Sequence, residues 1–119
     1  MSVFMDISTA LDAFDALSQR TRLETLRHLV RAGADGLPAG DIARAQGVPH
    51  NTMSAHLAVL FSAGLVASQR EGRVIRYRAR YDTLRDLIGF LMRDCCQGAP
   101  EIVGDLPTLV PSCIKGDCT

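Results

Sequence analysis

The sequence predicts one mainly α-helical domain that carries a β-hairpin. Three observations lead to this prediction: apolar residues recur at helical spacing up to residue 63, the pattern alternates after Gly64, and a helical stripe returns after Asp82. The length of 119 residues is ordinary for a single domain. Hydrophobic residues make up 47% and charged residues 22%, close to the averages of soluble globular proteins, which argues against disorder as the dominant state.

Two helices are expected in the first third of the chain, from Ile7 to about Gly33. Their apolar stripes are Leu11 and Phe14 in the first helix, and Leu23, Leu26, Leu29 and Val30 in the second. Ser18 lies between the two stripes and is a suitable N-cap for the second helix. Gly33 and Gly36 then end that helix, because glycine is common just after the last helical turn.

Residues 38–63 have the order that is typical of a helix-turn-helix. Pro38 opens a short helix over residues 39–46, and Gly47-Val48-Pro49 forms the turn. A longer helix follows from about His50 to Ala63. Its apolar residues recur at helical spacing and are Met53, Leu57 and Leu60.

Alternation after Gly64 predicts two strands, over residues 65–70 and 73–80, with Glu71-Gly72 at the tip of the hairpin. Asp82 is then expected to cap a final helix that reaches Cys95. The apolar stripe of this helix is Leu84, Leu87, Ile88, Leu91 and Met92. A helix-turn-helix followed by a hairpin is the winged helix-turn-helix plan, which places a helix in the major groove of DNA.

Polar and basic side chains gather on two of these elements. The longer helix carries short hydrogen-bonding residues that suit phosphates and base edges: His50, Asn51, Thr52, Ser54 and His56. Taken alone, they fit an ordinary polar helix face equally well. The hairpin favours DNA, because five arginines fall within eleven residues against a single Glu71: Arg70, Arg73, Arg76, Arg78 and Arg80. Thirteen basic and thirteen acidic residues give the chain no net charge, so the basic surface is local.

Residues 16–80 resemble the ArsR/SmtB family of homodimeric, metal-responsive repressors. ALSQRTRLETL at residues 16–26 is similar to the opening of the family, MSAHLAVLFSAGLV at residues 53–66 to its recognition helix, and REGRVIRY at residues 70–77 to its wing. Ala55 departs from the arginine that members commonly carry, which leaves one DNA contact in doubt.

This resemblance implies double-stranded operator DNA as a partner and a homodimer that forms through the first and last helices. The residues that it places near the operator are Asn51, Thr52, Ser54, His56, Arg73 and Arg76. We accordingly expect a DNA-binding and dimerisation domain over residues 1–96, followed by an irregular, cysteine-containing tail over residues 97–119. The apolar stripes of the first and last helices fit either a dimer interface or the core of the monomer.

The four cysteines, Cys95, Cys96, Cys113 and Cys118, all lie in the last quarter of the chain, which suggests a local site. Two effector sites of the family are disfavoured, because residues 37–44 contain no cysteine and residues 81–94 contain no histidine. The segment that begins Cys95-Cys96 resembles the C-terminal site of arsenite-sensing members. Adjacent thiolates favour a soft, thiophilic centre, so As(III) or Sb(III) is the expected effector.

Several alternatives remain open at this point. The third sulfur of a three-thiolate site could come from Cys113 or, less well, from Cys118, whereas a two-thiolate site would suit an organoarsenical. A thiol redox switch, or a constitutive regulator with structural cysteines, is possible on the same fold. We expect no enzyme activity and no catalytic cofactor, since no catalytic constellation stands out. No membrane-spanning or signal segment is evident, so the expected location is the cytoplasm.

Overall fold

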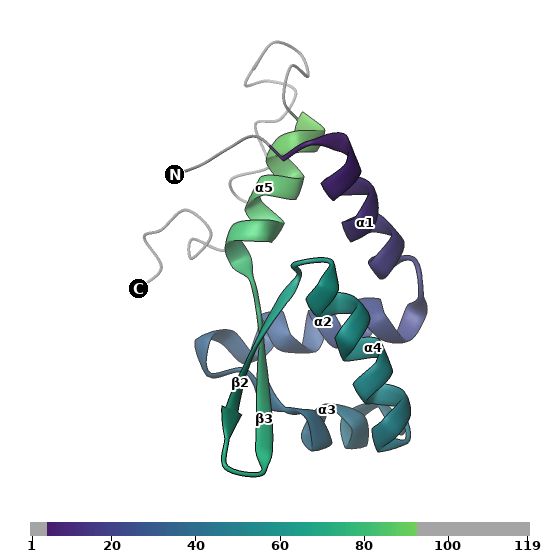
Figure 1. Ribbon diagram of the computed structural model, residues 1–119, viewed down its shortest axis with the longest axis vertical. Helices are drawn as coiled ribbons and strands as arrows, with labels where there is room; N and C mark the ends of the chain where they lie inside the picture. Colours follow the sequence, from purple (N-terminus) through teal and green to yellow (C-terminus); the bar gives the residue numbers. More distant parts are fainter. Residues whose placement is uncertain (1–4, 93–119) are drawn as a thin grey trace.

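The computed structural model of the protein describes residues 5–92 and is shown in Figure 1. The helices of this part are α1 (Ile7–Leu17), α2 (Arg20–Ala32), α3 (Ala39–Gln46), α4 (His50–Ser62) and α5 (Tyr81–Met92), with a 3-10 turn at Gly33–Asp35. The strands are β1 (Leu37–Pro38), β2 (Val66–Glu71) and β3 (Val74–Ala79). None of the helices within this range is long and apolar enough to cross a membrane.

The first two helices meet at a corner whose cap differs from the prediction. Ser18 was expected to cap α2, but it ends α1, and its hydroxyl donates to the Asp15 carbonyl at 2.8 Å. The cap of α2 is Gln19, whose backbone is extended and whose Oε1 accepts from the Arg22 amide at 2.8 Å. The expectation for Ser18 was therefore wrong, because the hydroxyl is used by the preceding helix.

The helix-turn-helix is confirmed closely. Helix α3 ends at Gly47, which adopts a left-handed conformation with φ of 65° and turns the chain toward α4. The predicted apolar stripe of α4 is buried: Met53, Leu57 and Leu60 are all fully enclosed. They pack with Ile42 of α3 and Leu29 of α2 in one hydrophobic core. This core fixes which face of α4 is left to solvent.

The sheet has three strands in the order β1-β3-β2, all antiparallel. A hairpin of two strands was expected, so β1 is a correction: Leu37 pairs with Tyr77, and Pro38 with Arg76. Gly36 permits this contact, because a Cβ at that position would overlap the backbone carbonyl of Tyr77. The pairing depends on a partner about forty residues away in sequence, which local alternation does not reveal.

The hairpin turn and the start of α5 each differ from the prediction by a residue or two. Glu71 pairs with Val74, so the turn of the hairpin is Gly72-Arg73 and not Glu71-Gly72. Gly72 has φ of 66°, the positive value that the first position of a two-residue hairpin turn requires. Asp82, expected to cap α5, lies inside its first turn and pairs with Arg80 at 2.8 Å. The Arg80 guanidinium holds the pKa of Asp82 below its ordinary value through this hydrogen bond.

Helix α5 is tied to α2 at its start, where the Tyr81 hydroxyl donates to the Val30 carbonyl at 3.0 Å. In Figure 1, α1 and α5 lie at the upper end of the molecule, whereas α3 and the tip of the hairpin lie at the lower end. The predicted continuation of α5 to Cys95, and the boundary at residue 96, lie outside the described residues.

Candidate DNA-binding surface

Four of the five polar residues predicted on the helix of residues 50–63 lie on its exposed face. His50, Asn51, Thr52 and Ser54 are all exposed, whereas the stripe of Met53, Leu57 and Leu60 on the same helix is buried. Asn51 Oδ1 accepts from the Thr52 amide at 2.9 Å, which orients the side chain at the start of the helix. Short hydrogen-bonding side chains on the first two turns of an exposed helix suit base edges and phosphates.

His56 is placed differently from these four residues. It is half-buried, and its Nδ1 lies 3.5 Å from Nη1 of Arg22 on α2. The Nε of Arg22 donates in turn to the Ala16 carbonyl at the end of α1, at 2.7 Å. His56 therefore lies at the junction of α4 with α2, and its contact with DNA stays a prediction.

A buried threonine holds both helices of the helix-turn-helix against α2. Thr25 is fully buried, and its Oγ1 accepts from Nε2 of Gln46 on α3 at 2.6 Å. The same hydroxyl donates to the sulfur of Met53 on α4 at 3.6 Å. Thr25 was not among the residues predicted from the sequence to matter. It precedes the buried Leu29 by four residues, so helical spacing could have placed it on the buried face.

Two of the five arginines predicted on the hairpin form an ion pair with a carboxylate. Arg76 Nε pairs with Glu71 at 3.1 Å, and its Nη1 donates to the Asp35 carbonyl at 3.3 Å. Arg80 pairs with Asp82. Across residues 5–92, the hairpin arginines without a carboxylate partner are Arg70, Arg73 and Arg78. Of the three arginines predicted to contact DNA, Arg70 and Arg73 thus keep their charge available, and Arg76 shares it.

A cleft of about 420 Å³ lies between α3, the start of α4 and β3. It brings together three residues that were predicted to contact DNA, namely His50, Ser54 and Arg73. Arg44 and Asp41 of α3, which form an ion pair with each other, line the same cleft. The prediction from sequence did not include Arg44, because nothing local to α3 indicates that the hairpin lies beside it.

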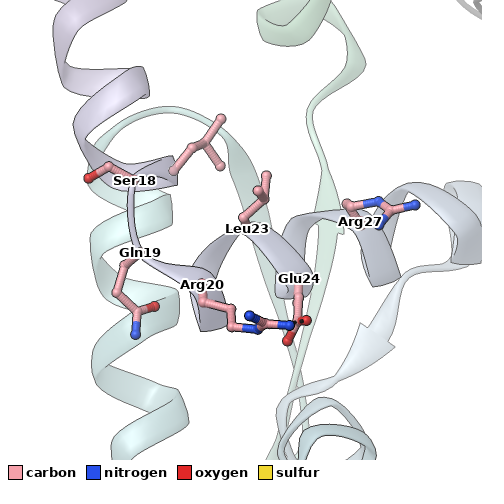
Figure 2. A pocket seen from close by; sticks show the side chains of 7 residues that line it. Ser18, Gln19, Arg20, Leu23, Glu24 and Arg27 are labelled. Carbon is pink, nitrogen blue, oxygen red and sulfur yellow. Dashed lines mark ion pairs between the residues drawn. The ribbon is translucent and has the colours of Figure 1, made fainter.

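A second hollow, drawn in Figure 2, lies where α1 meets α2. Its charged residues include Arg20 and Glu24, which pair with each other at 3.4 Å. Ser18 and Gln19, also in this hollow, are occupied in ending α1 and beginning α2. Its lining contains no residue that was predicted to contact DNA, and we assign it no binding role.

An apolar face remains exposed at the other end of the molecule. Ile7, Leu11 and Phe14 of α1 are 65%, 59% and 38% exposed, and Leu91 of α5 is 54% exposed. In the stripe of α5, Leu87 belongs to the core, whereas Leu84 and Ile88 are half-buried. The stripes that the sequence assigned to either the core or an interface are therefore divided: their inner residues belong to the core, and their outer residues are exposed in the single chain.

The predicted effector ligands Cys95, Cys96, Cys113 and Cys118 lie outside the described residues. Between residues 5 and 92, no group of three or more His, Cys, Asp or Glu side chains is arranged to hold a metal ion. The expectation that these thiols lie near the end of α5 therefore stays a prediction from the sequence.

Comparisons with known proteins agree with this geometry. A family model described as a helix-turn-helix domain matches residues 17–69. An ArsR-like transcriptional regulator from a Rhodococcus species is 29% identical, with 87% of this chain and 93% of that one covered and a TM-score of 0.66. No curated protein matches the chain.

Two further solved structures are similar. A homodimeric winged helix-turn-helix DNA-binding domain from Mycobacterium bovis, described as a possible ArsR-family regulator, is 30% identical; the match covers 74% of this chain and 84% of that one, with a TM-score of 0.60. The transcriptional repressor BigR from Xylella fastidiosa is 25% identical, with 75% and 88% covered and a TM-score of 0.57.

Proposed function

The chain belongs to the ArsR family of winged helix-turn-helix transcriptional regulators, which are DNA-binding proteins and not enzymes, and we propose that it is an arsenic-responsive repressor. In this proposal a homodimer binds operator DNA. It leaves the operator when trivalent arsenic or antimony binds to cysteine thiolates near the end of α5.

The exposed face of α4 and the free arginines of the hairpin support the mode of DNA binding. In a winged helix-turn-helix, the exposed helix enters the major groove, while the wing lies beside it. His50, Asn51, Thr52 and Ser54 supply hydrogen-bonding groups to base edges and to phosphates at the edge of the groove, and Arg70 and Arg73 supply charge to phosphates. Arg76 contributes less, because Glu71 shares its charge.

The apolar face of α1 and α5 supports the homodimer. Leu11 and Leu91 leave more than half of their side-chain surface to water in a single chain, an arrangement that is stable when a second copy covers it. A two-fold axis through this face would pair identical patches and place two copies of α4 on successive turns of one side of the duplex. The similar domain from Mycobacterium bovis, which is homodimeric, supports the same assembly.

One observation carries the choice of effector: Cys95 and Cys96 are adjacent in sequence and follow the last described residue of α5 by three and four positions. Two neighbouring thiolates suit As(III) or Sb(III), which accept two or three sulfur ligands and keep a lone pair on the remaining side. Zinc is a poorer match, because its structural sites need four ligands in a tetrahedron. Cys113, or less well Cys118, supplies the third thiolate in the three-coordinate form.

Helix α2 offers a route from the effector to DNA. The start of α5 is bonded to α2 through Tyr81 and Val30, and Thr25 of α2 bonds to both Gln46 and Met53. A metalloid that displaces α5 would therefore shift α3 and α4 through one helix. The two states of the dimer need differ in metalloid affinity by only a few kcal/mol for the operator to be released.

The proposal is tested by operator release. The probe is a labelled duplex that the protein itself selects from a random-sequence pool, with binding to reduced protein followed by fluorescence anisotropy. Arsenite is added in one arm, and a trivalent methylarsenical, zinc and hydrogen peroxide in the others. Arsenite should release wild-type protein, whereas the double variant Cys95→Ser/Cys96→Ser should bind the duplex normally and ignore arsenite.

Single substitutions among residues 97–119 distinguish a two-thiolate from a three-thiolate arsenic site. Cys113→Ser should lose the response to arsenite and keep the response to the methylarsenical if Cys113 is the third ligand, and Cys118→Ser is the matched control. Release of the wild type by zinc alone, or by peroxide alone, would contradict the arsenic proposal. Peroxide release that depends on the same cysteines would replace it with a thiol redox switch.

A further inference from the structure

We propose that the cleft between α3, α4 and β3 seats a backbone phosphate of the operator, with Arg44 as an additional DNA contact. The inference rests on the proposed DNA-binding function and assigns a ligand class to a specific place on that surface. It starts from the arrangement of side chains in the cleft, which come from three separate elements.

Hydrogen-bond donors reach the cleft from three separate segments, between apolar side chains of β3 and the start of α3. Arg44 comes from α3, His50 and Ser54 from the first two turns of α4, and Arg73 from the turn of the hairpin. The volume of about 420 Å³ is enough for a small anionic group together with its neighbours. Guanidinium groups bind phosphate oxygens in a planar, two-pronged geometry, and hydroxyl and imidazole groups add further hydrogen bonds.

The position of the cleft explains why a backbone phosphate is the ligand. The major groove, where α4 is proposed to lie, is separated from the adjacent minor groove by one sugar-phosphate strand. A wing that lies beside the helix therefore has this strand between itself and the helix. The cleft occupies that place, since α4 forms one of its walls and β3 another.

The charge of the cleft is favourable but partly masked. Arg44 and Arg73 are positive, and Asp41 is the only carboxylate among its lining residues. Asp41 pairs with Arg44 one helical turn away, and the two side chains are 47% and 75% exposed. Exposed ion pairs of this kind are weak, so the Arg44 guanidinium can exchange the carboxylate for a phosphate. Asp41 therefore competes with DNA for Arg44.

Salt dependence distinguishes a phosphate contact from other roles. Arg44→Gln should lower affinity about tenfold for both the selected duplex and a scrambled duplex, because phosphates carry no sequence information. The slope of log affinity against log salt concentration should fall by about two, because each protomer of the bound dimer no longer neutralises one phosphate. Asp41→Asn should raise affinity about two- to fivefold, since the competing carboxylate is removed.

Two controls keep the outcome interpretable. Arg44→Lys retains the charge and should keep most of the salt slope. Arg85→Gln alters an exposed residue of α5, a helix that lies at the opposite end of the molecule from α3 (Figure 1), and should change neither quantity. Circular dichroism of each variant verifies that it folds. An Arg44→Gln protein with unchanged affinity and slope would overturn the inference.

A loss of affinity confined to the selected duplex, with the slope unchanged, would also overturn it and make Arg44 a base contact. The proposed function is judged separately, from the binding of the wild type and its release by arsenite.

Discussion

The two ends of the molecule expose opposite chemistry. At the lower end in Figure 1, the start of α4 and the hairpin present hydrogen-bonding and basic side chains, whereas α1 and α5 at the upper end present Leu11, Phe14 and Leu91. Contacts with phosphates weaken as the salt concentration rises, whereas burial of apolar surface is not weakened in this way and favours a lasting partner. Under the proposed function, one small domain thus separates a reversible DNA-binding surface from a lasting dimer surface.

Helix α2, in the middle of the molecule, is bonded to helices at both ends. Helix α2 bonds to α5 through Val30, to α1 through Arg22, and to α3 and α4 through Thr25. The polar surface is therefore held by a core that also contacts the helices of the apolar face.

The largest effect is expected at the apolar end. Leu11→Glu places a charge on a residue that is 59% exposed in the single chain, so the chain should fold but fail to dimerise. A monomer loses the second half-site, and operator affinity should fall by at least about a hundredfold. Sedimentation measures the mass of the protein in solution, and fluorescence anisotropy measures its affinity for the operator. Leu11→Met, which keeps the surface apolar, should remain dimeric, and a dimeric Leu11→Glu protein would refute the assignment.

The next effect concerns the middle of the molecule. Thr25→Val keeps the shape but removes the hydroxyl that pairs with Gln46, so the glutamine amide loses its partner. The free energy of unfolding should fall by about 1–3 kcal/mol, as measured by urea denaturation. Thr25→Ser retains the hydroxyl and should lose less. Equal losses in the two variants would mean that packing, and not the hydrogen bond, matters at this position.

At the polar end, two arginines of the same hairpin should behave differently. Arg73→Gln removes a charge with no carboxylate partner among residues 5–92, and the salt slope of operator binding should fall by about two, one for each protomer of the dimer. Arg76→Gln should change the slope less, because Glu71 already neutralises part of that charge. Anisotropy titrations at several salt concentrations measure the salt slope of each variant. A larger change for Arg76→Gln would reverse our ranking of the wing residues.

The smallest effect belongs to the ion pair that joins the hairpin to α5. Arg80 holds the folded-state pKa of Asp82 below its ordinary value of 3.8, so the pair stabilises the fold above that value. This contribution is lost as the pH falls through the lowered pKa. Both side chains are about half exposed, so solvent screening limits the effect to under about 1 kcal/mol.

Asp82→Asn should accordingly be slightly less stable than the wild type at pH 7, and urea denaturation should show this difference shrinking as the pH falls through the lowered pKa of Asp82. A difference that persists below that pKa would point to packing and not to charge.

Much of the fold could be predicted because it depends on local periodicity. The stripe of Met53, Leu57 and Leu60 determines which face of α4 is buried, and thereby leaves Asn51 and Thr52 exposed. What the sequence did not reveal depends on distant partners. Strand β1 exists because Gly36 lets the chain approach Tyr77.

The candidate site likewise combines residues that could be predicted from their own segments with contacts that depend on distant partners. His50, Ser54 and Arg73 were predicted from their own segments, but their common cleft with Arg44 arises only when α3 packs beside β3. The pairing of Arg76 with Glu71 likewise follows from the register of the hairpin, which a count of charges does not contain.

The separation of the two ends is tested most directly by amide hydrogen exchange of the full chain, free and bound to the selected duplex. The account predicts that DNA slows exchange over residues 39–56 and 70–76, while α1 and α5, already covered in the dimer, exchange at the same rate with and without DNA. Protection of α1 and α5 by DNA, with no change in α4 or the hairpin, would contradict it.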